Sequence, residues 1–299
     1  MKKYKLIITA FILVSARLSM AMPAKEPDTL KGYKFTVSYS KGEERRATYI
    51  ANLVAGAVNY YQKMLGVTPE FKLTIWNEAD WKIYVTNSAI YGMPHYNGKT
   101  LVVAATDNPF WKGYAPLLNQ LPKNERDAAM KVYKTADGSL SMQAFFDLLA
   151  IHELGHAFQW QAEIKMQRKW MSELYVNILL HSYIAENKPV LLPALTIFPK
   201  MVVAGGTKGF TYTSLSDADE HYNELGEKYP MNYGWYQCRW HTTAATIYEK
   251  SGSQAAKKLW NAFKDQKERL KDEELMTLLT ATDINVADMV KNWDVNTIK

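Results

Sequence analysis

The sequence predicts an α+β fold, with a small mixed β-sheet in the N-terminal half, a mostly helical C-terminal half and a cleft between them. Three short runs of alternating or β-branched residues lie before residue 106, and helical patterns separate them. From Trp170 onwards almost every segment has helical spacing of its apolar residues. The motif His152-Glu153-Leu154-Gly155-His156 lies between these two regions.

Length and charge limit the classes of protein to consider. The 299 residues can bury an extensive core, and we expect residues 22–299 to form a single domain with two subdomains, roughly 30–163 and 164–299. The formal charge is +6, but residues 1–21 hold four basic residues and no acid, which leaves +2 on the rest. Because no cluster of Lys and Arg stands out there, nucleic acid is not an expected partner. No pattern predicts an oligomeric state.

The first 21 residues have the pattern of a secretory signal peptide. Three lysines are followed by an apolar run at residues 6–16, and Ser19-Met20-Ala21 offers small residues before a cleavage site. The alternative is a buried N-terminal strand or helix. The apolar run is too short to span a bilayer and no cysteine follows it, so no stable membrane anchor is expected. The sequence therefore predicts an exported protein, periplasmic or extracellular.

The N-terminal half is expected to alternate strands and helices. Residues 22–30 are polar and contain proline, which indicates a disordered lead-in. Asn97-Gly98 has the composition of a tight turn. Helices are expected at residues 43–65 and 80–86, and strands at residues 34–39, 71–76 and 100–105.

The C-terminal half is expected to be helical. A polar helix at residues 124–133 precedes the helix of the motif, which begins near Ser141. Segment 188–211 contains three prolines and Gly205-Gly206, which indicates an apolar connector that either lines the cleft or packs over the helices. Further helices are expected at residues 170–186, 216–227, 232–251, 253–265, 267–280 and 286–293.

The histidine motif indicates a metal site. His152 and His156 are four residues apart, so on a helix they lie one above the other and can bind one Zn²⁺. Glu153 lies about 100° round the helix, beside the open coordination position, where it can take a proton from an activated water. The alternatives are a chance match and a pair of core histidines with ordinary hydrogen-bond partners.

A catalytic zinc needs a third protein ligand. A histidine six residues after the pair is absent, since that position is Ala162. Glu173 is the candidate, because residues 157–172 are enough to finish one helix, turn and bring a second helix back past the first. Its apolar flanks favour a ligand over the alternative, a solvated carboxylate. Asn177 follows one turn later and could hydrogen-bond a ligand imidazole.

The motif, followed by Trp170-Met171-Ser172-Glu173, resembles the gluzincin metallopeptidases, the group that contains thermolysin and the zinc aminopeptidases. The resemblance spans roughly residues 70–260, although only the zinc motif is specific. It implies a zincin-like fold with an active-site cleft, one zinc per chain held by His152, His156 and Glu173, and Glu153 as general base. It also implies that the substrate is a peptide or protein.

The same resemblance implies two further parts of the site. Such enzymes have an edge strand that runs antiparallel to the bound peptide, and a tyrosine that hydrogen-bonds the tetrahedral intermediate. Tyr236, within Tyr233-Gly234-Trp235-Tyr236-Gln237, is similar to that tyrosine, and Tyr233 is the second choice. The matching strand comprises Thr100, Leu101, Val102, Val103, Ala104 and Ala105.

This sequence differs from the gluzincin pattern in two ways, and these differences limit which peptidase activity is expected. The gap from His156 to Glu173 is slightly shorter than in the best-known members. No acid lies between Tyr91 and Thr106, whereas zinc aminopeptidases hold the substrate amine with acidic residues, so aminopeptidase activity is not expected. Two other functions remain open: a zinc-dependent hydrolase of a non-peptide substrate, and a non-catalytic binding protein on a peptidase scaffold. An intact Glu153 argues against the second.

Overall fold

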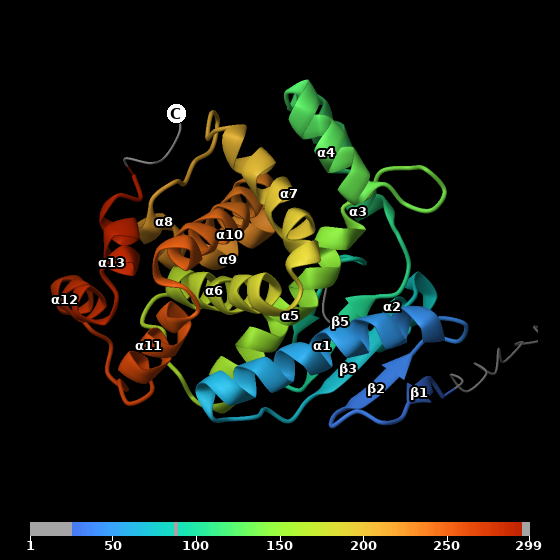
Figure 1. Cartoon of the computed structure of the whole chain (residues 1–299), viewed down its shortest axis with the longest axis horizontal. Coiled ribbons are helices and arrows are strands. Elements are labelled where there is room, and N and C mark those ends of the chain that lie inside the picture. Colours follow the sequence, from blue (N-terminus) through green and yellow to red (C-terminus); the bar gives the residue numbers. More distant parts are fainter. Residues whose placement is uncertain (1–25, 87–88, 295–299) are drawn as a thin grey trace, which may run out of the picture.

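The computed structural model describes residues 26–86 and 89–294, so the expected signal peptide lies outside the described residues. The sheet lies at one end of the molecule, helices α11 to α13 lie at the opposite end, and α1 runs from the sheet towards α11 (Figure 1). Buried apolar side chains of both halves belong to one hydrophobic cluster that runs from Val37 to Trp293. None of the helices in the described part of the chain is long and apolar enough to cross a membrane.

The sheet is mixed, with strand order β1-β2-β3-β5-β4. The three predicted strands are present as β2 (Thr36–Tyr39), β3 (Lys72–Trp76) and β5 (Thr100–Ala104), and they run parallel to one another. Ala105 extends the pairing, since its N–H donates to the carbonyl of Trp76 at 2.7 Å. Two antiparallel strands border them, β1 (Asp28–Leu30) and β4 (His95–Tyr96).

These two border strands correct the sequence-based expectations. β1 occupies the end of the segment expected to be a disordered lead-in. β4 pairs with Leu101 and Val102, so β5 is an inner strand and the expected edge position of residues 100–105 is wrong. The Asn97-Gly98 turn explains why: Asn97 Oδ1 accepts the N–H of Thr100 at 2.9 Å, and the chain before the turn therefore lies beside β5.

The helices of the N-terminal half pack on and around this sheet. α1 (Glu44–Leu65) lies across it and contacts α5 (Gln143–Gln161), the helix of the histidine motif. Between β3 and α5 the chain forms short helices and one projecting helix: α2 (Glu78–Tyr84), α3 (Pro109–Lys112), the 3-10 helix η1 (Ala115–Gln120) and α4 (Lys123–Tyr133).

A buried ion pair joins α1, β5 and α5. The Arg46 guanidinium donates to both carboxylate oxygens of Asp147 and also to the carbonyls of Ala104 and Ala105, at 3.3 and 3.2 Å. The exposed fractions of the Arg46 and Asp147 side chains are 12% and 6%. Asp147 lies five residues before His152, so this pair fixes the motif helix against the sheet.

The C-terminal half is helical, as the sequence predicts. The predicted helix at residues 216–227 is two helices that meet at His221, and the one expected from residue 267 starts later. The helices are α6 (Lys169–Asn187), the 3-10 helix η2 (Pro189–Leu191), α7 (Leu192–Ala204), α8 (Leu215–Glu220), α9 (Tyr222–Lys228), α10 (Pro230–Ser251), α11 (Gln254–Phe263), α12 (Asp272–Thr282) and α13 (Ile284–Lys291).

The expected connector at residues 188–211 is mostly helix α7, despite Pro199 in its interior. The hydroxyl of Tyr133, from α4, lies in the turn that precedes Pro199. It donates to the carbonyl of Ala194 at 2.8 Å and accepts the N–H of Phe198 at 3.1 Å. A side chain from a distant helix thus satisfies backbone groups beside the proline, and local sequence could not reveal this.

Candidate metal centre

Three side chains from two helices converge on one point. His152 and His156 come from α5 and Glu173 from α6, and their potential ligand atoms all lie within 4.8 Å of one another. The two Nε2 atoms are 3.2 Å apart, and the Glu173 carboxylate oxygens lie 3.3 Å from Nε2 of His152 and 3.6 Å from Nε2 of His156. Two ligands bound at about 2.0–2.1 Å to a tetrahedral zinc lie roughly 3.3 Å apart. The separations between the candidate ligand atoms are close to this value, so the cluster could hold an ion of this size.

A glycine in the motif brings the two helices together. A Cβ placed on Gly155 would lie 2.8 Å from both Cβ and Cγ1 of Val176 on α6, a distance that real Cβ contacts do not reach. Only glycine therefore permits this separation of α5 and α6. Because His156 and Glu173 are on these two helices, the same close approach brings the ligand atoms within reach of one ion.

Hydrogen bonds orient both imidazoles. Nδ1 of His152 lies 2.9 Å from Oδ1 of Asn177, and Nδ1 of His156 lies 3.2 Å from Oε1 of Gln159. Ser172 donates its hydroxyl to the same Gln159 oxygen at 2.9 Å. With amide oxygens facing the rings, Nδ1 donates a hydrogen bond in each, so Nε2 is the atom that faces the shared position and can bind a metal once its proton is displaced. Asn177 lies where the sequence spacing predicts, whereas Gln159 was not anticipated.

A second set of hydrogen bonds holds the Glu173 carboxylate. The Tyr222 hydroxyl donates to Oε1 at 2.7 Å and Gln237 Nε2 donates to Oε2 at 3.2 Å. Both groups also contact the Tyr233 hydroxyl, at 3.2 Å from Tyr222 and 2.9 Å from Gln237. Sequence reasoning missed Tyr222 and Gln237, because α9 and α10 are distant from Glu173 along the chain and no local pattern marks their contact with it.

The electrostatics of the cluster favour a cation. Burial raises the pKa of Glu173, but His156 and the hydrogen bonds from both imidazoles outweigh it and hold this pKa well below its usual range. Burial likewise lowers the pKa of His156, yet the Glu173 carboxylate raises it to about 9. The site thus stabilises a positive charge between these groups, and a divalent ion would replace the proton there. The donor set fits zinc, with two imidazole nitrogens, one carboxylate and room for a fourth ligand.

Glu153 lies beside the cluster and is not part of it. Its Oε2 accepts the N–H of Tyr96, on strand β4, at 3.0 Å. Burial raises the pKa of this half-buried carboxyl, although the neighbouring His156 and His152 oppose the shift. The neighbouring N–H of Asn97 donates towards β5, so the N–H of Tyr96 faces the outer side of β4. Glu153 therefore lies along the open edge of the sheet.

The structure places Tyr236 away from the cluster. Its hydroxyl donates to the carbonyl of Ser214 at 2.7 Å, and its fully buried ring stacks against Trp240 and Trp293. Tyr233 and Gln237, one turn apart on α10, face Glu173 instead. Tyr236 lies about 100° round the helix from Gln237, which directs its ring into the core. Of the two candidate tyrosines, Tyr233 is therefore the one that lies near Glu173.

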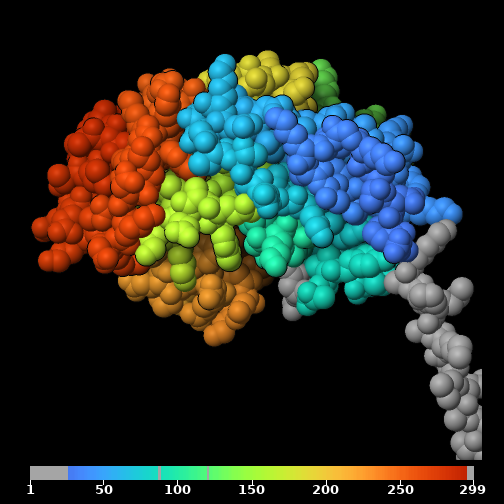
Figure 2. Space-filling model, turned by 90° about the horizontal axis from the view of Figure 1, so that it is seen from below, coloured from blue at the N-terminus to red at the C-terminus, as the bar shows by residue number. Residues whose placement is uncertain are grey.

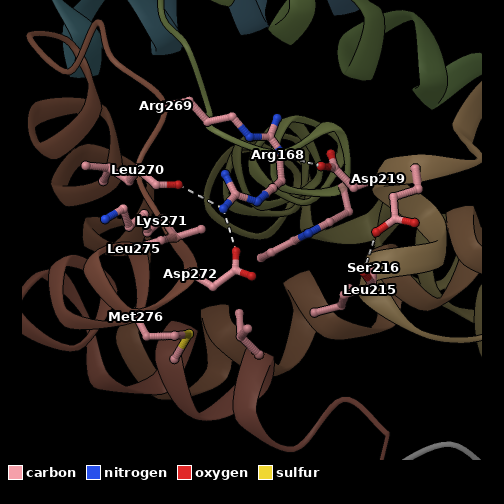
Figure 3. A pocket seen from close by; sticks show the side chains of 13 residues that line it. Arg168, Leu215, Ser216, Asp219, Arg269, Leu270, Lys271, Asp272, Leu275 and Met276 are labelled. Atoms are coloured by element: carbon pink, nitrogen blue, oxygen red, sulfur yellow. Dashed lines mark hydrogen bonds and ion pairs between the residues drawn. The ribbon is translucent and has the colours of Figure 1, made fainter.

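A cavity of about 610 Å³ elsewhere in the described chain contains none of these residues. It lies at the start of α6, over an apolar floor that includes Leu275 and Met276 (Figure 3). Its arginines are paired with acids: Arg168 with Asp272, and Arg269 with Asp219 at 2.8 Å. The first pair joins the α5–α6 turn to α12, and the second joins the loop between α11 and α12 to α8.

No protein-family model matches this chain, and no curated protein matches it. Function is therefore inferred from the geometry of the site.

Proposed function

We propose that this protein is an exported zinc metallopeptidase of the gluzincin type, with a zincin-like arrangement of sheet, motif helix and helical C-terminal half. One observation supports this above all. Nε2 of His152, Nε2 of His156 and the Glu173 carboxylate converge at 3.2–3.6 Å, while Glu153 stays outside the triangle on the open edge of the sheet. A purely structural cluster would need no second carboxylate in that place.

In this proposal each step of peptide hydrolysis is assigned to a particular group of the site. Zinc, when bound by His152, His156 and Glu173, supplies Lewis acidity that polarises the scissile carbonyl and acidifies a water molecule. Glu153 takes the proton from the water and passes it to the leaving amine. A carboxyl whose pKa is raised by burial is suited to both transfers. The Tyr233 hydroxyl, beside Glu173, donates a hydrogen bond to the oxyanion.

The substrate would pair with the outer edge of β4. An extended peptide can add to an exposed strand edge through main-chain hydrogen bonds. Glu153 accepts the N–H of Tyr96 on that edge. A peptide paired there would take over this N–H and pass directly beside Glu153. The antiparallel direction follows the gluzincin resemblance. This assignment moves the expected substrate strand from residues 100–105 to β4.

The proposal is tested by cleavage of an unbiased peptide library, with and without a chelator. Glu153→Gln should keep the zinc and the fold while cleavage falls by several orders of magnitude, because water activation depends on the carboxylate. Glu163→Gln changes an exposed carboxylate just beyond α5 and should cleave like the wild type. If Glu153→Gln cleaves as fast as Glu163→Gln, the hydrolytic mechanism is wrong and a binding function moves ahead.

A further inference from the structure

One tryptophan lies on the surface close to the proposed cleft. Trp160 has an exposed fraction of 68%, whereas none of the other eight tryptophans exposes more than 4%. It belongs to the last turn of α5, four residues after His156. The chain around the end of α5 and the turn that follows it, in lime green, reaches the surface between the blue and cyan N-terminal half and the orange segments (Figure 2). An exposed indole offers a large, rigid apolar surface and one N–H donor for contact with a ligand.

Trp160 is aligned with Glu153 along helix α5. Seven residues separate the two, which is two helical turns, so they share one face of α5 at roughly 10 Å along its axis. Glu153 accepts the N–H of Tyr96, and the Trp160 ring meets the Tyr96 ring edge-on, with centroids 6.4 Å apart. Its indole also lies 3.7 Å from where a Cβ on Gly98 would be. The catalytic carboxylate and the exposed indole thus both border the β4 hairpin.

The surface around the indole is fixed by hydrogen bonds. The Tyr96 hydroxyl donates to the carbonyl of Gly98 at 2.7 Å and accepts from Gln161 Nε2 at 2.9 Å. Gln161 is itself held by the backbone of Glu70, since its Oε1 accepts the N–H and its Nε2 donates to the carbonyl, both at 2.7 Å. An aromatic ring on such a preformed surface offers contact area at little cost in conformational entropy.

We propose that Trp160 forms the floor of a subsite that selects an aromatic or large aliphatic side chain of the substrate peptide. The inference rests on the proposed peptidase function. In an extended peptide, at roughly 3.3 Å per residue, a distance of about 10 Å corresponds to two or three residues. The β4 hairpin runs from Tyr96, beside Glu153, to Gly98, beside Trp160, so an antiparallel peptide places its amino side over the indole. The selected residue therefore lies two or three positions before the scissile bond.

The experiment measures peptide binding separately from cleavage. Zinc-loaded Glu153→Gln is titrated with labelled peptides that carry Phe, Leu, Ala or Arg at these positions, and fluorescence anisotropy reports the affinity. Phe and Leu peptides should bind about 3- to 10-fold more tightly than the Ala peptide, the range for one aromatic or apolar contact. Adding Trp160→Ala should remove this preference, and Trp160→Phe should retain part of it. Adding Val190→Ala, at an 83% exposed side chain of η2, should leave it unchanged.

Each outcome separates the subsite from the peptidase function. Equal preferences with and without the Trp160→Ala substitution, alongside wild-type cleavage of peptides, would overturn the subsite and leave the peptidase standing. A Trp160-dependent preference without wild-type cleavage would support the subsite and overturn the peptidase. If peptides neither bind nor are cleaved, both are overturned. Tightest binding of the Arg peptide would contradict an apolar subsite.

Discussion

At the scale of single residues, the proposed mechanism depends on which tyrosine hydroxyl lies near Glu173. Tyr233 is partly exposed and its hydroxyl contacts the groups that hold Glu173. Burial raises the pKa of Tyr233, so the hydroxyl stays protonated at neutral pH and can donate a hydrogen bond. Tyr236 donates its hydroxyl proton to a backbone carbonyl within the core instead.

We therefore predict that two matched substitutions affect different properties, one the activity and the other the stability. Tyr233→Phe should keep the zinc and lose about 2–4 kcal/mol in kcat/KM, as expected when one oxyanion donor is removed. Tyr236→Phe should keep kcat/KM and lose about 1–2 kcal/mol of unfolding free energy, because the carbonyl of Ser214 loses its donor. Peptide kinetics and denaturant titration measure the two effects. A larger loss of kcat/KM in Tyr236→Phe would reverse the assignment.

The sequence predicts those site residues that are close to one another along the chain, and not those that come from distant helices. His152, Glu153 and His156 are on one helix, so their spacing alone fixes their geometry. Glu173 and Asn177 are on the next helix, and a short helical hairpin is also a local arrangement. Tyr222 and Gln237 reach Glu173 only because distant helices pack there, and no spacing encodes that.

At the scale of elements, the approach of α5 and α6 decides whether the ligands meet. Gly155→Ala places a methyl group 2.8 Å from Val176 and should force the helices apart. We predict a loss of about 1–3 kcal/mol of unfolding free energy, the usual range for overpacking, together with weaker zinc retention. Thermal unfolding and metal analysis after dialysis measure both.

Gly234→Ala is the matched control for this substitution. Gly234 also lies inside a helix, α10, but a Cβ there meets no atom within 4 Å. It should therefore gain about 0.5–1 kcal/mol from helix propensity and keep its zinc. If Gly155→Ala is as stable as Gly234→Ala, the contact of Gly155 with Val176 does not determine the spacing of α5 and α6.

Most elements of the fold follow from sequence periodicity, and the exceptions have physical causes. α1, α5, α6 and α10 are long enough for a stable apolar pattern, and all four were expected. β4 has two paired residues, too few to show alternation. α7 contains Pro199, a local signal for a break, and forms with the help of the Tyr133 hydroxyl.

At the scale of the whole molecule, the Arg46–Asp147 pair joins the sheet to α5, the helix of the histidine motif. Asp147→Asn would leave a buried guanidinium without its counter-charge, which costs about 3–5 kcal/mol when one partner of a buried pair is removed. Denaturant titration should show this loss. Glu78→Gln breaks the exposed Lys82–Glu78 pair, whose side chains are 71% and 57% exposed, and should change stability little. Equal stability of the two variants would contradict a structural role for Arg46.

The measurement that tests the central claim most directly is the zinc content of the purified protein. Wild type should retain about one zinc per chain, while His156→Ala and Glu173→Gln should lose most of it, because each removes one of three protein ligands. His221→Ala changes a histidine outside the cluster, which contacts Glu224 at 3.3 Å, and should keep the metal. Equal zinc content in wild type, His156→Ala and Glu173→Gln would contradict the assignment of these residues as a zinc site.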